Sequence, residues 1–278
     1  MMIVTLGIEN KRPKELSKRL SALFRPCRIS ARLRKQNRIS VLQLKYELYR
    51  GKPDMKRLTP YLRNRDVEIV CSRENGYELA PYRRFECRDF ARMMMLSLAR
   101  DVLTRSGSAQ ELRAALCDPT GSCPHIAEAL TDICHELTVV TNRPEFYGGV
   151  SDRLYEERGA SLIVSDSIDA LHDCDILLCC DAPDIHYPLR RDALVLSAEK
   201  PLVALANTVI YDYRVAVPYK YQRLRPGYID EFSFLSALYT LGGVKELASL
   251  VPSCGGDGEN VYTAERLFAR LSSLRHSA

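Results

Sequence analysis

Short apolar runs alternate with amphipathic helical patterns through the second half of the chain. Apolar runs without polar alternation are typical of strands that are buried on both faces of a parallel sheet. The helical patterns between them predict right-handed crossover helices. The stretch from Leu112 to Asp181 is therefore predicted to form a Rossmann-type βαβαβ unit. The predicted strands cover residues 112–117, 137–141, 161–164, 175–180, 194–196 and 202–205, and the predicted helices cover 124–135, 144–158 and 167–172.

The remainder of the second half continues this pattern. Residues 213–217 are expected to extend the sheet. Residues 229–241 and 263–274 have the apolar spacing of closing helices. Three glycines within residues 255–258 predict a flexible loop between these helices.

The first half of the chain predicts a smaller α/β unit. A β-prone run stands near the start, and Pro13 opens a helical pattern that ends at Pro26. The predicted strands cover residues 3–8, 41–48 and 67–70, and the predicted helices cover 13–23, 53–62 and 87–104. We expect a basic α/β domain over residues 1–106, with a hinge at 106–110. A Rossmann-like domain, a parallel sheet with helices on both faces, is expected over 107–278.

The composition is that of a globular protein, because 46% of the residues are apolar and 27% are charged. No apolar run approaches the roughly 20 residues of a membrane-spanning helix. The first residues become charged too soon for a signal peptide. We therefore expect a cytoplasmic protein that does not enter a membrane. The ten cysteines contain no C-x-x-C pair, so they predict core packing and no metal site.

Charge is distributed unevenly along the chain. Residues 1–106 carry 25 Lys or Arg and 11 Asp or Glu, whereas residues 107–278 carry 15 and 24. The densest basic stretch, residues 11–38, holds eleven cations and a single aromatic residue, Phe24. Such a stretch attracts phosphate backbones, but base stacking needs aromatic side chains. Two interpretations stay open: a solvated basic face that meets an acidic domain or partner, and, less favoured, a nucleic-acid surface.

The turn after the first predicted Rossmann strand, residues 117–124, lacks the glycine-rich fingerprint of dinucleotide-binding folds. Glycines let the backbone approach a pyrophosphate at the helix N-terminus, and only Gly121 remains here. Thr120 and Ser122 still offer hydroxyl groups. Either the amides of residues 121–123 bind an anion, or the turn is a capped helix start without a ligand. Inward-pointing amides would favour the anion, and a turn filled by its own side chains would exclude it.

Asn142 and Arg143 follow the second predicted strand, where an arginine accommodates the 2′-phosphate of NADP. Together with the order of elements, this step resembles the Rossmann domains of shikimate dehydrogenases and glutamyl-tRNA reductases over about residues 110–205. The resemblance implies an NAD(P)-binding domain behind a smaller α/β domain. The chain lacks that group's glycine-rich turn and the N-V-T-x-P-x-K segment that holds the catalytic lysine of shikimate dehydrogenases. No catalytic residue is therefore carried over.

Asp181 follows the fourth predicted strand, at the edge of the sheet where ligands of open α/β sheets bind. With Asp184 and His186 it offers a carboxylate and an imidazole for acid–base chemistry, although this spacing is more typical of loop residues. His125 stands in the first turn of the first Rossmann helix, where a neutral imidazole suits a phosphate. The catalytic residues stay unassigned.

These features predict a protein that binds NADP, another nucleotide or a small molecule. The residues expected to form that site are Thr120, Gly121, Ser122, Asn142, Arg143 and Asp181. An enzyme of this kind would be an NAD(P)-dependent oxidoreductase, by analogy of fold alone. The alternative is a non-catalytic binding or assembly protein, with a degenerate nucleotide site and an arginine-rich domain that contacts an acidic partner or nucleic acid. The sequence names no substrate, and it leaves open whether a cofactor binds and whether the chain forms a homo-oligomer.

Overall fold

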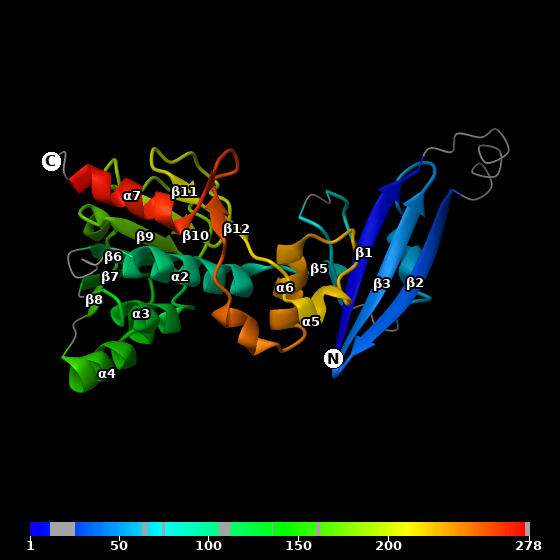
Figure 1. The fold of residues 1–278 in the computed structure, drawn as a ribbon, viewed down its shortest axis with the longest axis horizontal. Coiled ribbons are helices and arrows are strands. Elements are labelled where there is room, and N and C mark those ends of the chain that lie inside the picture. The colour runs from blue at the N-terminus through cyan, green and yellow to red at the C-terminus, as the bar shows by residue number, and fades with distance from the viewer. Residues whose placement is uncertain are drawn as a thin grey trace. The chain divides into compact units, whose positions relative to one another are not determined.

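The chain forms two compact units, each assembled from two separate segments (Figure 1). The computed structural model describes residues 1–11, 26–62, 66–73, 76–105, 112–134, 136–159 and 162–275. Unit 1 combines Met1–Phe90 with Ala216–Leu247, and unit 2 combines Ala91–Val215 with Ala248–Ala278. The division expected near residue 106 differs from this grouping, because it assigned residues 216–247 to the second domain.

The sheet of unit 1 has five strands in the order β2-β3-β1-β4-β5. Only β2 runs antiparallel to its neighbour, β3, and the other neighbours pair in parallel. The strands span Met2–Asn10 (β1), Cys27–Gln36 (β2), Ile39–Leu48 (β3), Glu68–Val70 (β4) and Arg83–Arg84 (β5). The three predicted strands are confirmed as β1, β3 and β4. Strand β2 was not predicted, although apolar residues at 27, 29, 31 and 33 alternate with polar ones, because its dense arginines were interpreted as a charged surface and most of its side chains are exposed.

The helices of unit 1 are short. They span Met55–Leu58 (η1), Tyr219–Gln222 (α5) and Glu231–Thr240 (α6). The helix predicted over 53–62 is thus a single 3-10 turn, and the helix predicted over 13–23 lies outside the described residues. The helix predicted over 229–241 is confirmed as α6, but it belongs to unit 1. Asp230 caps α6 by accepting a hydrogen bond from the Ser233 backbone at 2.8 Å.

Unit 2 contains a six-stranded, fully parallel sheet in the order β11-β10-β9-β6-β7-β8. When the strands are numbered along the chain from β6 and the sheet is read from its β8 edge, this is the order 3-2-1-4-5-6 of the Rossmann fold. The strands span Arg113–Cys117 (β6), Glu136–Val140 (β7), Leu162–Ser165 (β8), Ile176–Cys179 (β9), Leu194–Ser197 (β10) and Val209–Ile210 (β11). The predicted parallel α/β fold is therefore confirmed, and helices flank the sheet (Figure 1). The first five predicted strands of this half correspond to β6 to β10.

Three predictions for the remaining part of unit 2 were wrong. Residues 202–205 form no strand, and Leu202 is 75% exposed, so its apolar character did not lead to burial. Strand β12, Asp212–Arg214, does not extend the parallel sheet, because it pairs antiparallel with β13. The predicted glycine loop is strand β13, Cys254–Gly256, followed by β14, Val261–Tyr262.

The remaining helices lie in unit 2 or at its boundaries, and several are shorter than the predicted helical patterns. They span Arg88–Thr104 (α2), Pro124–Thr131 (α3), Pro144–Phe146 (η3), Gly148–Arg158 (α4), Ile168–Leu171 (η4), Lys245–Ser249 (η5) and Ala264–Arg275 (α7). The helix predicted over 144–158 is divided into η3 and α4. The hinge predicted at 106–110 lies outside the described residues. Within the described ranges, no helix combines the length and the apolar character needed to cross a bilayer.

The cysteines pack mainly as small apolar side chains. Seven of the ten are buried: Cys71, Cys117, Cys123, Cys134, Cys174, Cys179 and Cys180. Three of these lie in the apolar cluster around β6 and β9. Burial raises the pKa of the Cys134 thiol to about 11 and that of Cys174 to about 12, because a thiolate is poorly solvated there. These thiols therefore stay protonated at neutral pH.

The turn between β13 and β14 makes unit 2 sensitive to acid. Asp257 accepts hydrogen bonds from the Asn260 backbone at 2.6 Å and the Glu259 backbone at 2.9 Å, and these bonds lower its pKa to about 2. A lowered folded-state pKa contributes stability above the unfolded pKa of about 4. Because the carboxylate is largely exposed, we expect a contribution below about 1 kcal/mol. It should disappear as the pH falls from 4 to 2.

The variant Asp257→Asn tests this contribution. Equilibrium urea unfolding of both proteins is expected to show a constant difference between pH 7 and 5 that closes towards pH 2. A difference that does not change with pH would assign the effect to the shape of the turn instead of the charge.

Candidate functional site

The turn between β6 and α3 is organised by Asp118, a residue that the sequence reasoning did not single out. Its side chain is fully buried. One carboxylate oxygen, Oδ2, accepts hydrogen bonds from the Cys123 backbone at 2.7 Å and from the Tyr147 hydroxyl at 2.6 Å. The Asp118 carbonyl accepts the Gly121 backbone N–H at 3.1 Å. Two of the three amides expected to bind an anion are therefore occupied within the turn.

A second layer closes the turn over Gly121. This glycine has a φ of +67°, and a Cβ on it would lie 2.6 Å from Cδ2 of Phe146 and 2.8 Å from Cβ of Arg143. Such approaches exclude every side chain larger than hydrogen. Gly121 thus serves close packing against η3. The turn is therefore filled by side chains. From the sequence, such a filled turn was expected to exclude a bound anion.

The hydroxyl groups predicted for the site do gather there. Thr120 Oγ1 lies 2.9 Å from Ser122 Oγ, 3.2 Å from Asp118 Oδ1 and 3.5 Å from Asp181 Oδ2. Thr120, Ser122 and Asp181 are therefore brought together at the carboxyl ends of β6 and β9. These neighbouring strands are in register, with Cys117 opposite Cys179.

Arg92 of α2 completes this cluster. Its Nη2 donates to Asp181 Oδ1 at 2.7 Å, and its Nε donates to the Cys180 carbonyl at 2.9 Å. The Arg92 side chain is 11% exposed, so the ion pair is better shielded than a surface pair. Sequence reasoning missed Arg92 because it stands far from the Rossmann strands in the chain and lies on a helix whose apolar pattern indicated only packing.

The other residues considered for the site are exposed and are not part of this cluster. Asn142 and Arg143 are exposed, and Arg143 Nη1 is 3.5 Å from Glu145 Oε1. His125 and His186 are exposed as well. The roles suggested for these four residues stay predictions.

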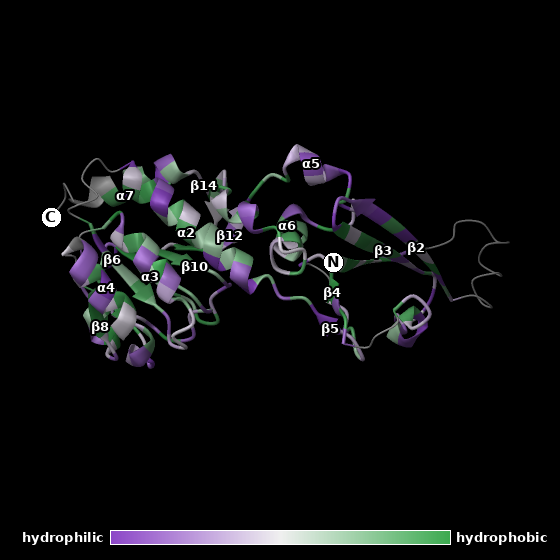
Figure 2. Cartoon of the chain, turned by 90° about the horizontal axis from the view of Figure 1, so that it is seen from below, coloured by the Kyte–Doolittle hydropathy of each residue, from purple (hydrophilic) through white to green (hydrophobic). Residues whose placement is uncertain are grey.

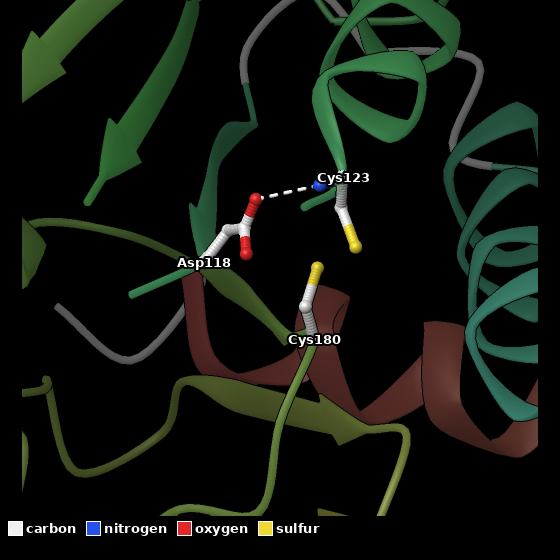
Figure 3. Close-up of side chains that lie close together, drawn as sticks. All are labelled: Asp118, Cys123 and Cys180. Carbon is white, nitrogen blue, oxygen red and sulfur yellow. Dashed lines mark hydrogen bonds between the residues drawn. The ribbon is translucent and has the colours of Figure 1, made fainter. Parts of the chain in front are cut away.

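Two buried thiols face each other beside Asp118 (Figure 3). A hydrogen bond from the Cys180 thiol lowers the pKa of Cys123, and the same contact raises the pKa of Cys180. Burial and the bond to Asp118 raise the pKa of Tyr147 well above its usual value, so its hydroxyl remains a donor. The place where a Rossmann fold holds pyrophosphate is thus taken by a carboxylate, two thiols and a phenol.

Unit 1 contains a separate basic groove. Its volume is about 660 Å³. We define the basic groove by its lining residues, Arg32, Leu33, Arg34, Lys35, Gln36, Tyr219, Lys220, Arg223 and Leu224. Among the described residues, this lining contains five cations and no carboxylate. Figure 2 shows hydrophilic positions on both β2 and α5. The groove is part of a unit whose two segments carry 26 Lys or Arg and 13 Asp or Glu.

The two sides of the basic groove are joined by hydrogen bonds. Arg34 Nη1 donates to the Arg223 carbonyl, and Gln36 Nε2 donates to the Lys220 carbonyl. Tyr219 supplies an exposed aromatic ring at this place, since it is 81% exposed. The sequence indicated no aromatic residue near the basic stretch because Tyr219 lies more than 180 residues further along the chain. Only the fold brings it beside β2.

No protein-family model and no curated protein matches the chain. Among solved structures, L-tryptophan dehydrogenase from Nostoc punctiforme is 10% identical with a TM-score of 0.32, over 99% of this chain and 80% of that chain. Quinate dehydrogenase from Corynebacterium glutamicum, solved with NAD, is 10% identical with a TM-score of 0.27, over 71% and 80%. A Delta(1)-pyrroline-2-carboxylate reductase from Thermococcus litoralis, solved with NADH and L-proline, is 16% identical with a TM-score of 0.30.

The match to the reductase covers 39% of this chain and only 36% of that chain. These three structures are a reductase and two dehydrogenases, and their identities to this chain do not exceed 16%. The assignment of unit 2 to the Rossmann fold rests on its own strand order, since all these similarities are low.

Proposed function

We propose that the protein binds single-stranded nucleic acid in the basic groove of unit 1, and that unit 2 is a Rossmann-like scaffold. The observation that carries this proposal is the exposed ring of Tyr219 beside five cations in a groove of about 660 Å³. Cations alone would suit any polyanion. An exposed aromatic ring among them adds a stacking surface for unpaired bases. The bases of a duplex are already stacked on one another, so they cannot use this surface.

The chemistry of the groove suits a phosphate backbone. Arg32 and Arg223 are exposed and can each pair with a phosphate, and each such contact releases condensed counterions. Lys220 is partly engaged, because its Nζ lies 2.6 Å from Glu246 Oε1. A base stacked on Tyr219 would add about 1–3 kcal/mol of binding free energy.

Fluorescence anisotropy with a labelled single-stranded oligonucleotide tests the proposal. The double variant Arg32→Gln/Arg223→Gln is expected to weaken binding and to reduce the slope of log K against log salt by about 1.4, which is about 0.7 for each lost phosphate contact. The matched control Arg50→Gln/Lys52→Gln removes two exposed cations of unit 1 outside the groove. Tyr219→Ala should weaken binding about 5- to 150-fold. An unchanged affinity in the groove variants, or equal binding of a duplex, contradicts the proposal.

A nicotinamide cofactor in unit 2 is the second candidate. The observation that favours it is the strand order, because Rossmann folds bind dinucleotides where the order reverses, here between β6 and β9. In this candidate, NADP would be preferred to NAD because of Arg143, and the reaction would be an oxidoreduction. The contact residues would be Thr120, Gly121, Ser122, Asn142, Arg143 and Asp181. The cofactor would have to displace Asp118 from the Cys123 amide.

Titration of the full chain with NADPH and NADH distinguishes the two candidates. A cofactor at about 100 times its Kd would stabilise the protein by about 2.7 kcal/mol and raise its melting temperature. Arg143→Gln should weaken the binding of NADPH and leave the binding of NADH unchanged. No thermal shift and no change in cofactor fluorescence at millimolar concentration would remove this candidate.

A further inference from the structure

The buried cluster of Asp118, Cys123 and Cys180 has the composition of a metal site. Three separate elements supply it: Asp118 follows β6, Cys123 precedes α3, and Cys180 follows β9. One ligand atom from each lies within 4.8 Å of the others, and all three side chains are buried. Figure 3 shows the two sulfur atoms pointing towards each other beside the carboxylate.

The contacts around Asp118 hold its carboxylate in one orientation. Its Oδ2 accepts from Tyr147 and from the Cys123 backbone, and its Oδ1 lies within 3.4 Å of the Ser122 hydroxyl. Bonds of this kind orient the carboxylate ligands of metal sites and strengthen binding. The cluster is therefore positioned before any ion arrives.

The charges of the cluster also fit a divalent cation. Two thiolates and one carboxylate carry three negative charges, and a divalent ion leaves one of them unbalanced. Arg92 donates to the Cys180 carbonyl but is already paired with Asp181, so the ion neutralises two of the three charges and leaves one. A divalent ion therefore removes most of the cost of burying three uncompensated charges.

We propose that Asp118, Cys123 and Cys180 bind one thiophilic divalent cation of the zinc class, with the fourth coordination position left for water. Sulfur ligands select zinc-like ions over magnesium or calcium, and three protein ligands with an open position are a known zinc arrangement. Binding replaces the two thiol protons, which pass to the solvent. The sequence predicted no metal site because these ligands share no short spacing and only the sheet brings them together.

Cobalt titration of the full chain tests the site. The protein is reduced with a phosphine, freed of metal with a chelator and titrated with Co²⁺, which gives a near-ultraviolet thiolate band and visible bands when its coordination is tetrahedral. We expect one Co²⁺ per chain, displaced by Zn²⁺, with about two protons released at pH 7. Cys123→Ser and Cys180→Ser should each lower the affinity about 100-fold or more. Cys254→Ser, which changes a thiol of unit 2 outside the cluster, should leave the bands unchanged.

A conservative variant keeps the test decisive if a cysteine variant does not fold. Tyr147→Phe keeps the ring and removes only the hydroxyl that orients Asp118, so we expect about 10- to 100-fold weaker Co²⁺ binding with the thiolate band retained. The proposal is overturned if the reduced protein shows no thiolate band. It is also overturned if the band survives in folded Cys123→Ser and Cys180→Ser, or if Cys254→Ser removes it. A metal site of this kind is independent of nucleic-acid binding by unit 1, so either proposal can fail alone.

Discussion

Replacing Asp118 with alanine is expected to lower the free energy of unfolding of unit 2 by about 2–6 kcal/mol. The substitution leaves the Tyr147 hydroxyl and the Cys123 N–H without the acceptor that they share, at a place where the side chains of all three residues are buried. Each unsatisfied buried donor costs about 1–3 kcal/mol. Hydrogen-exchange mass spectrometry should show faster exchange in peptides from β6 and β9 and no change in peptides from β1 and β3.

The control for this variant is Asp152→Ala, which removes an exposed carboxylate of the same unit, on α4. It should change stability by less than about 0.5 kcal/mol. If Asp118→Ala is as stable as Asp152→Ala, the carboxylate does not organise the turn, and the closed turn no longer argues against an anion there.

Phe234→Ala is expected to destabilise unit 1 by about 3–5 kcal/mol. Phe234 lies on α6 and is fully buried. The whole of the parallel sheet separates α6 in sequence from the first segment of unit 1, Met1–Phe90. α6 packs against β4, so a cavity at its centre should weaken the pairing of β4 with β1. Faster hydrogen exchange in peptides from β1 and β4 would report this loss.

Tyr219→Ala serves as the aromatic control within the same segment. Its ring is 81% exposed, and its removal should change stability by less than about 0.5 kcal/mol. A fragment that ends at residue 106 lacks both Phe234 and the rest of α6, and it should therefore be unfolded. A folded fragment with native exchange rates would show that the predicted domain boundary at 106 is correct.

The parallel sheet of unit 2 could be predicted from the sequence because of where its strands lie. β9 and β10 are buried along their whole length, so residues 176–179 and 194–196 appear as continuous apolar runs. The crossover rule then restricts their order. Residues 202–205 have the same composition but are partly exposed, and no local pattern separates the two cases.

The candidate sites could be predicted less well, because their chemistry depends on partners that are distant in sequence. Thr120, Ser122 and Asp181 were placed together by the rule that parallel strands end at one edge. The role of Asp118 depends on Tyr147, and Asp181 is bound by Arg92 from α2. A pattern within one element cannot indicate such pairs. The stacking surface of Tyr219 beside β2 was missed for the same reason.

The interleaving of the two units has a consequence for the order of events during synthesis. When the ribosome has completed Phe90, unit 1 still lacks Ala216–Leu247, and with it the buried face of α6. At about 5–20 residues per second, that segment follows roughly 8–30 s later. During this interval the nascent sheet must keep an apolar surface uncovered, which makes it a substrate for chaperones. The time at which α6 covers this apolar surface is therefore set by the rate of translation and does not depend on how fast the strands of unit 1 pair.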